Sequence, residues 1–166
     1  MKVQIRLTGK LLGEIKQDLL RPHAFAAERV GFVFGKLGNQ SASEPMILLS
    51  DYRPVSDDNY IYDPSVGARI NSAAIRGTMQ HVLDTGSGAF HVHLHEQYGK
   101  PKFGLTDARE IPNVVAGLRV AGGKQAHGML LLSFDSCFAK VWMPNNPEAV
   151  PASKISIVGY PLSIIE

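Results

Sequence analysis

Hydrophobic positions along the chain follow two periodicities, one typical of strands and one typical of helices. Alternating or continuously apolar stretches predict strands at residues 3–7, 30–35, 46–49, 89–95, 128–133, 138–143 and 153–160. Apolar residues spaced three and four apart predict helices over about residues 11–20, 70–84 and 111–121. The alternation in residues 3–7 is typical of an edge strand, and residues 50–66 are predicted to form a long polar loop.

Strands and helices that interleave in this way indicate an α/β or α+β domain. We expect a mixed β-sheet flanked by helices in three layers. The length of 166 residues favours a single domain spanning residues 1–166. The helices predicted at 70–84 and 111–121 argue against an all-β barrel.

Composition and charge exclude several classes of protein. The chain has 17 basic and 15 acidic residues with no block of like charge, which argues against a dedicated nucleic-acid binder. Its single cysteine, Cys137, cannot form an internal disulfide, which is typical of a reducing compartment, so a cytoplasmic protein is expected. No apolar signal segment is expected at the N-terminus. The longest apolar run, Met129–Leu132, is too short to cross a membrane.

Three histidines at alternate positions stand out as candidate chemistry. In an extended strand His91, His93 and His95 project to the same face. Asp107 follows at the start of a predicted helical segment, and a loop of this length can bring its carboxylate back beside the strand. Two imidazoles and one carboxylate are the ligand set of a catalytic zinc with one position open for water. Glu28, directly before an apolar strand, is a candidate base.

Each of these residues also has a purely structural interpretation. A histidine on a strand is usually a hydrogen-bonded core or surface residue. Asp107 is most simply a helix N-cap, with Glu110 three residues later completing a capping-box pattern. Glu28 on its own is a solvated charge at the end of a helix. The combination indicates a site, because burying three imidazoles without a function is costly.

Two separated motifs resemble the JAMM (JAB/MPN, Mov34-type) zinc metalloprotease family, in its prokaryotic, deubiquitinase-like branch. The first is similar to the family's E-x-x-G-x-x-x-G strand, and the second to its H-x-H…S-x-x-D zinc motif. The matching residues are Glu28, Gly31 and Gly35, then His93, His95, Gly104 and Asp107. The resemblance covers most of residues 11–143 and implies a JAB/MPN-like fold.

The resemblance also implies roles for four residues. His93, His95 and Asp107 would hold Zn²⁺, and Glu28 would be the catalytic base that activates water. The alternative pair His91 and His93 would lie two residues further from Asp107, so His93 and His95 are preferred.

The chain departs from the family pattern at three points. Gly104 stands where the family has a serine that helps to stabilise the tetrahedral intermediate. Loss of one such donor typically costs ~10²–10³ in rate, unless Thr106 supplies a hydroxyl instead. Glu96 stands where a proline commonly follows the second histidine, and the loop before Asp107 is one residue longer than usual.

The function implied by the resemblance is zinc-dependent cleavage of a peptide or isopeptide bond at the C-terminal tail of a ubiquitin-like protein. Expected partners are that protein or its conjugates and the activating and conjugating enzymes of the same pathway, in antiviral defence or sulfur-carrier processing. The polar loop 50–66, with its tyrosines, is either the contact for this partner or a solvated surface loop. We expect no nucleic-acid or membrane partner.

Two alternatives compete with this function. The first is a catalytically weak or inactive MPN-type interaction module, which Gly104 favours weakly. The second is an unrelated metal enzyme such as a cupin dioxygenase, which also uses H-x-H on a strand and would need a further histidine, for which His127 is the candidate.

Overall fold

Eight strands, three α-helices and one short 3-10 helix make up the part of the chain that the computed structural model describes, residues 2–24, 26–38, 43–159 and 163–165. In chain order they are β1 (Val3–Thr8), α1 (Gly9–Leu19), β2 (Val30–Gly38), β3 (Met46–Pro54), η1 (Asp57–Asn59), α2 (Ser72–Thr85), β4 (Gly88–Leu94), α3 (Leu105–Ala121), β5 (His127–Leu132), β6 (Cys137–Trp142), β7 (Ala149–Val158) and β8 (Ser163–Ile165).

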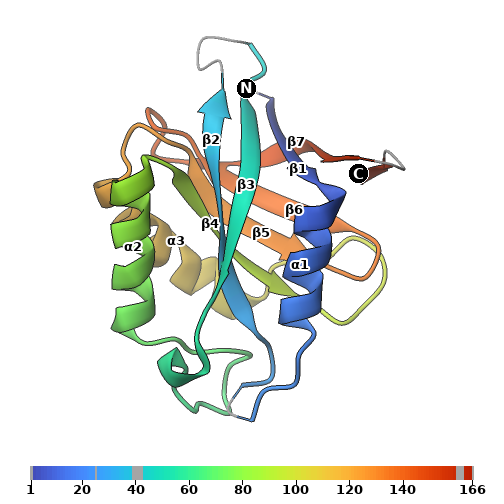
Figure 1. Ribbon diagram of the computed structural model, residues 1–166, viewed down its shortest axis with the longest axis vertical. Helices are drawn as coiled ribbons and strands as arrows, with labels where there is room; N and C mark the ends of the chain where they lie inside the picture. The colour runs from blue at the N-terminus through green and yellow to red at the C-terminus, as the bar shows by residue number, and fades with distance from the viewer. Residues whose placement is uncertain (1, 25, 39–42, 160–162, 166) are drawn as a thin grey trace.

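The strands form one mixed sheet that closes on itself (Figure 1). The order is β1-β3-β2-β4-β5-β6-β7, and β1 and β7 pair with each other to close the ring. The pairs β1–β3, β1–β7 and β4–β5 are parallel, and the other pairs are antiparallel. The long strand β7 has room for three partners, since its first residues pair with β6 and its later ones with β1 and with β8.

This closed seven-stranded barrel contradicts the predicted three-layer α/β sandwich of JAB/MPN type. The prediction of an edge strand at residues 3–7 is wrong for the same reason, because β1 is hydrogen-bonded to β3 on one side and to β7 on the other. Alternation reports which face of a strand is buried, and it carries no information on how many of its edges are paired. The helices at 70–84 and 111–121 also fail to exclude a barrel, because they pack against it from outside.

Three apolar clusters hold the helices against the strands, the smallest of which packs Ile111 and Val115 of α3 on Met129 of β5. Val3, Ile5 and Leu7 of β1 pack with the apolar face of α1, which contributes Leu11 and Ile15. A second cluster joins the opposite faces of β2 and β4 to α2 and α3, through Val30, Phe32, Phe34, Ala89, Val82 and Leu118. Figure 1 shows α2 and α3 together on one side of the sheet and α1 on another. Residues 30–35 of β2 are therefore buried on both faces, which explains their continuous apolar sequence.

The remaining predicted helices and strands are confirmed, with differences in their bounds, since β7, for example, begins at Ala149 and not at residue 153. β3 extends to Pro54 and takes in part of the predicted loop, and β8 was not predicted. Residues 39–42 of the predicted β2–β3 connection and Tyr160 at the end of the last predicted strand lie outside the described residues. Helix α3 begins at Leu105, before the predicted start near Ile111, and contains Pro112. Pro112 removes one backbone donor and its ring crowds the carbonyl four residues earlier, so it weakens the helix, while Asp107 accepts from the Gly104 N–H and stabilises the first turn.

Among the described residues, no helix has both the length and the apolar character needed to cross a membrane.

Candidate metal centre

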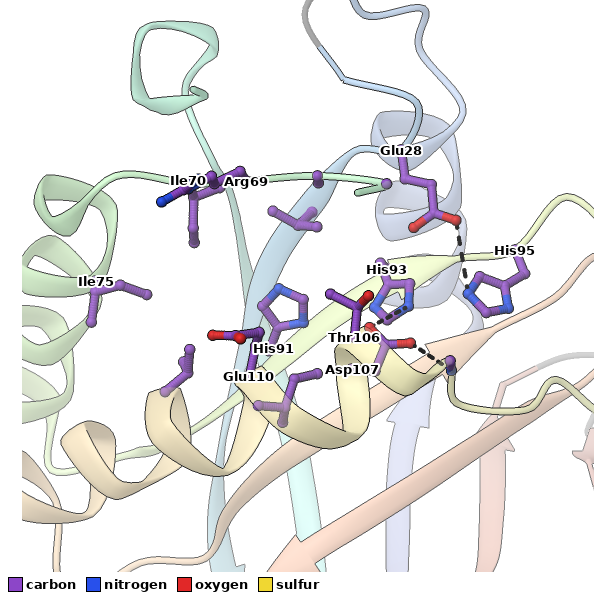
Figure 2. Close-up of a pocket in the computed structure, with 16 residues that line it drawn as sticks. Glu28, Arg69, Ile70, Ile75, His91, His93, His95, Thr106, Asp107 and Glu110 are labelled. Carbon is purple, nitrogen blue, oxygen red and sulfur yellow. Dashed lines mark hydrogen bonds and ion pairs between the residues drawn. The ribbon is translucent and has the colours of Figure 1, made fainter. Parts of the chain in front are cut away.

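A cavity of about 410 Å³ contains all the predicted site residues. Its floor is the histidine-bearing face of β4, and α3 and the segment of residues 67–70 form its walls (Figure 2). The lining residues are Glu28, Val30, Gly67, Ala68, Arg69, Ile70, Ile75, His91, His93, His95, Gly104, Thr106, Asp107, Glu110, Ile111 and Val114. One end is therefore rich in titratable side chains, and the other is lined by aliphatic side chains of α2, α3 and residue 70.

The three histidines line one face of the end of β4, as their alternate spacing predicted. The ring centroids of His91 and His93 are 5.6 Å apart, and those of His93 and His95 are 5.1 Å apart. His93 is buried, whereas the side chain of His95 is 23 % exposed. The His95 amide donates to Leu132 at the end of β5, which fixes the backbone just beyond β4.

The pairing of β2 with β4 brings Glu28 to the histidines. Val30, the first residue of β2, lies opposite His93 in the antiparallel register. Glu28 precedes β2 by two residues and therefore lies beside His95, with its Oε1 3.8 Å from His95 Nε2. Donor atoms of Glu28, His93 and His95 all lie within 4.8 Å of one another.

Asp107, in the first turn of α3, lies beside His93 but outside the group of Glu28, His93 and His95 whose donor atoms are all within 4.8 Å of one another. Its Oδ2 accepts from the Gly104 amide at 3.0 Å, and its Oδ1 lies 3.6 Å from His93 Nε2. Asp107 thus stabilises the start of α3 through Oδ2 and lies next to His93 through Oδ1. Burial opposes ionisation of Asp107, but the neighbouring His93 and the Gly104 amide outweigh it and hold the carboxyl pKa below its usual value.

The donor set fits a zinc ion. Neither ring nitrogen of His93 has a hydrogen-bond partner among the described residues, although both are buried, and an unpaired buried polar atom is costly. Two ligands at zinc–nitrogen or zinc–oxygen distances stand ~3.3 Å apart around a tetrahedral ion. The 3.6 Å between His93 Nε2 and Asp107 Oδ1 is close to this separation, and Asp107 would have to move for the same ion to be shared with His95, because it lies outside the group whose donor atoms are within 4.8 Å of one another.

His91 lies outside the group formed by Glu28, His93 and His95. Its ring packs edge-on against Phe32, and its Nδ1 is buried without a hydrogen-bond partner among the described residues. Burial, reinforced by the nearby His93, lowers the pKa of His91 to about 3, so this ring is neutral. The arrangement therefore favours the pair His93 and His95 over the pair His91 and His93.

The positions at which the chain departs from the family motif lie in or beside this cavity. Gly104 lines it without a side chain, while the Thr106 side chain in the first turn of α3 lies close to His93 (Figure 2). A hydroxyl is thus present at the wall of the cavity, two residues from Gly104. Glu96 lines a neighbouring cavity of about 490 Å³, and Glu28 borders both cavities.

Residues that hold Glu28 in place carry no signal in the sequence pattern. The buried Arg29 guanidinium donates to the carbonyls of Arg21 and Pro22 and pairs with Asp57 at 2.6 Å. The Tyr60 hydroxyl accepts from the Val30 amide at 2.8 Å and donates to the Val30 carbonyl at 3.1 Å. Both contacts join segments far apart in the chain, so neither periodicity nor motif spacing could have revealed them.

Two of the three tyrosines in the predicted partner-binding loop are used within the protein. Tyr52 donates to Asp18 Oδ2 at 2.6 Å and packs over Gly31, where any side chain would collide with its ring. Tyr60 is bound to the backbone of Val30. Only Tyr62, 68 % exposed, remains available among these three for contact with another molecule.

His127, the candidate additional ligand of a cupin-like enzyme, is fully engaged elsewhere. Its Nδ1 accepts from the Ala89 amide at 3.1 Å, and its Nε2 contacts the Gly122 carbonyl at 2.9 Å. Burial lowers the pKa of this ring, which is therefore a structural histidine. Neither protein-family models nor curated proteins show a match to this chain.

Proposed function

We propose that this protein is a zinc-dependent hydrolase that cleaves a peptide or isopeptide bond, with His93, His95 and Asp107 holding the metal and Glu28 carrying the proton. The observation that carries the proposal is the convergence of these four side chains from three separate elements in one cavity. The proposal rests on the site and its motifs, since the barrel is not the fold that the motifs imply.

Zinc, when bound, supplies a Lewis acid that polarises a carbonyl oxygen and lowers the pKa of water. His93 and His95 suit it as neutral nitrogen donors on a rigid strand, and Asp107 adds one negative charge. Asp107 is held in its ionised form by its low pKa and is oriented by the Gly104 amide. The three side chains are thus prepared for a cation before it arrives.

Glu28 is placed to act as a base beside the histidines, and its carboxylate makes no hydrogen bond with the residues that the structure describes. Its carboxylate is one-third exposed and borders both cavities, so it can take a proton from water and later give it to the departing amine. A substrate chain that crosses Glu28 would have one side of the cleaved bond in each cavity. The Thr106 hydroxyl is available as a hydrogen-bond donor at the same wall.

The finer substrate assignment is the C-terminal tail of a ubiquitin-like protein, as a precursor or a conjugate. It is supported by the H-x-H and E-x-x-G motifs. Activating and conjugating enzymes of the same pathway are the further partners in this proposal. We place the protein in the cytoplasm, since its one cysteine, Cys137, is a free and buried thiol.

A binding module without catalysis is the second candidate, and Gly104 is the observation that favours it. At this position the cavity wall lacks the hydroxyl that would stabilise an oxyanion. Such a module would keep the cavity and the barrel but would have no need of bound metal.

Metal content distinguishes the two candidates. The wild-type protein, His95→Ala and His81→Ala would be loaded with zinc, desalted and measured by mass spectrometry, with circular dichroism to confirm folding. His81 is a matched control, because it lies on α2 beside Asp51 and outside the cavity. We expect about one zinc per chain in wild type and His81→Ala, and little in His95→Ala. Negligible zinc in all three folded proteins would overturn the hydrolase proposal.

A further inference from the structure

The backbone of Gly67 lies directly against the carboxylate of Glu28. A Cβ added at Gly67 would be 2.7 Å from Glu28 Oε2 and 2.9 Å from its carboxyl carbon. The Gly67 carbonyl also accepts a hydrogen bond from the Glu28 amide at 3.0 Å. One residue therefore holds the backbone of Glu28 and at the same time leaves room for its side chain.

Gly67 belongs to a segment that is itself firmly held. Ile70 forms an antiparallel bridge with Tyr60, and the Ile61 amide donates to the Arg69 carbonyl at 2.8 Å. The Arg69 guanidinium pairs with Asp63 at 3.0 Å on the same turn. Because this segment is bound to residues 60–63, a clash at Gly67 would displace the free end of the Glu28 side chain before it displaced the backbone.

We propose that Gly67 is a positioning residue that sets where the Glu28 carboxylate lies, and that any side chain at this position displaces the carboxylate from its place beside the histidines. The role rests on the proposed function, in which Glu28 is the base. The φ angle of Gly67 is not in the left-handed region, so its backbone conformation is open to alanine. Glycine at position 67 is therefore needed to leave space for the Glu28 carboxylate, and not to allow a left-handed backbone conformation.

The Glu28 carboxylate has the histidines on one side and solvent on another. His93 and His95 lie on the inner side of the carboxylate, with donor atoms within 4.8 Å. The Glu28 side chain is already 33 % exposed on its outer side. A methyl group at Gly67 would collide with Oε2, whereas Oε1 is the oxygen 3.8 Å from His95 Nε2, so the carboxylate could not keep this arrangement beside the histidines.

Carboxyl footprinting of the metal-free protein tests this contact directly. Wild type, Gly67→Ala and the control Gly77→Ala would be labelled with a carbodiimide and glycine ethyl ester and analysed by peptide mass spectrometry. Gly77 is a suitable control because nothing lies within 4 Å of a Cβ built there. We expect the labelling rate of Glu28 to change several-fold in Gly67→Ala only, with the exposed Glu110 as internal reference. An unchanged rate at Glu28 would overturn the proposal.

A double-mutant cycle covers the case in which Gly67→Ala lowers stability. Glu28→Ala removes the carboxylate with which the new methyl group collides, so Gly67→Ala should lower the melting temperature in wild type but not in the Glu28→Ala background. An equal loss in both backgrounds would contradict the contact.

Zinc content and kinetics then separate this role from the proposed function. Gly67→Ala should bind as much zinc as wild type, because His93, His95 and Asp107 are untouched. Its kcat on a cleavable ubiquitin-like fusion should fall while KM is unchanged, whereas a fall in zinc content with Gly67→Ala would overturn the positioning role. Absence of zinc from wild type would reject the hydrolase alone, since the labelling experiment requires no metal.

Discussion

His93 Nε2 and Asp107 Oδ1 lie 3.6 Å apart, although one side chain comes from β4 and the other from the first turn of α3. The distance is too long for a good hydrogen bond and well suited to two ligands that share an ion. The other oxygen of Asp107 accepts from the Gly104 amide. The two oxygens of one carboxylate thus serve the helix and the candidate metal centre separately.

Asp107→Asn should separate these two roles. An asparagine keeps an oxygen for the Gly104 amide, so the melting temperature should change little. The negative charge at the centre is lost, and zinc affinity should fall by at least ~10–100-fold, the loss typical even of residues that only orient a ligand. Competition with a chromogenic chelator measures the affinity. Glu110→Gln, on α3 at the same cavity, is the control, and an equal loss in both variants would speak against Asp107 as a ligand.

Tyr60→Phe should destabilise the start of β2. The Val30 amide loses its acceptor at 2.8 Å, and an unsatisfied buried donor costs about 1–3 kcal/mol. Urea unfolding should therefore show a lower free energy of unfolding, by that amount. Tyr62→Phe is the control, because its exposed side chain should contribute less than about 0.5 kcal/mol. Equal stabilities of the two variants would show that the Tyr60 contact is unimportant.

Arg29→Met should cost about 1–2 kcal/mol, because the carbonyl groups of Arg21 and Pro22 lose their donor in a partly buried region. The ion pair with Asp57 contributes little to this figure, since Asp57 is largely exposed. Thermal unfolding of Arg29→Met and Arg69→Met gives the comparison. Arg69 pairs with Asp63 in an exposed position, so its loss should cost under about 1 kcal/mol. A larger cost for Arg69→Met would contradict this assignment.

His91 should make the metal-free protein sensitive to acid. Its pKa is lowered from 6.5 to about 3 in the folded protein, mainly by burial. As the pH falls from 6.5 towards 3, the unfolded chain binds a proton at this residue and the folded chain does not. The free energy of unfolding therefore falls by about 1.4 kcal/mol per pH unit for this one proton.

His91→Leu removes that proton and should make the pH dependence shallower by the same amount. Urea unfolding of both proteins at neutral pH and at about pH 4.5 measures the difference. At neutral pH His91 is largely uncharged in both the folded and the unfolded chain. A difference in stability between wild type and His91→Leu at that pH therefore reports packing. Parallel pH curves for wild type and His91→Leu would show that His91 takes up its proton in the folded protein.

The sequence alone determined the local structure and the chemistry of single segments. The 3.6-residue spacing of Leu11, Ile15 and Leu19 predicted α1, because a helix buries one face whatever it packs against. The alternation of His91, His93 and His95 placed three imidazoles on one face, because a strand has period two in every fold. Both properties follow from the backbone geometry of a single element.

Only the tertiary structure decided how these segments meet. The pairing of β1 with β7 closes the barrel, and it joins strands about 150 residues apart in the sequence. This pairing depends on backbone hydrogen bonds, which almost any sequence can form. The pattern of side chains therefore does not predict it. The contact of Gly67 with Glu28 arises in the same way, from a loop brought by Tyr60 and Ile70 to the start of β2. The ligand types could be read from the sequence, but their distances depend on the register of β2 against β4 and on the start of α3.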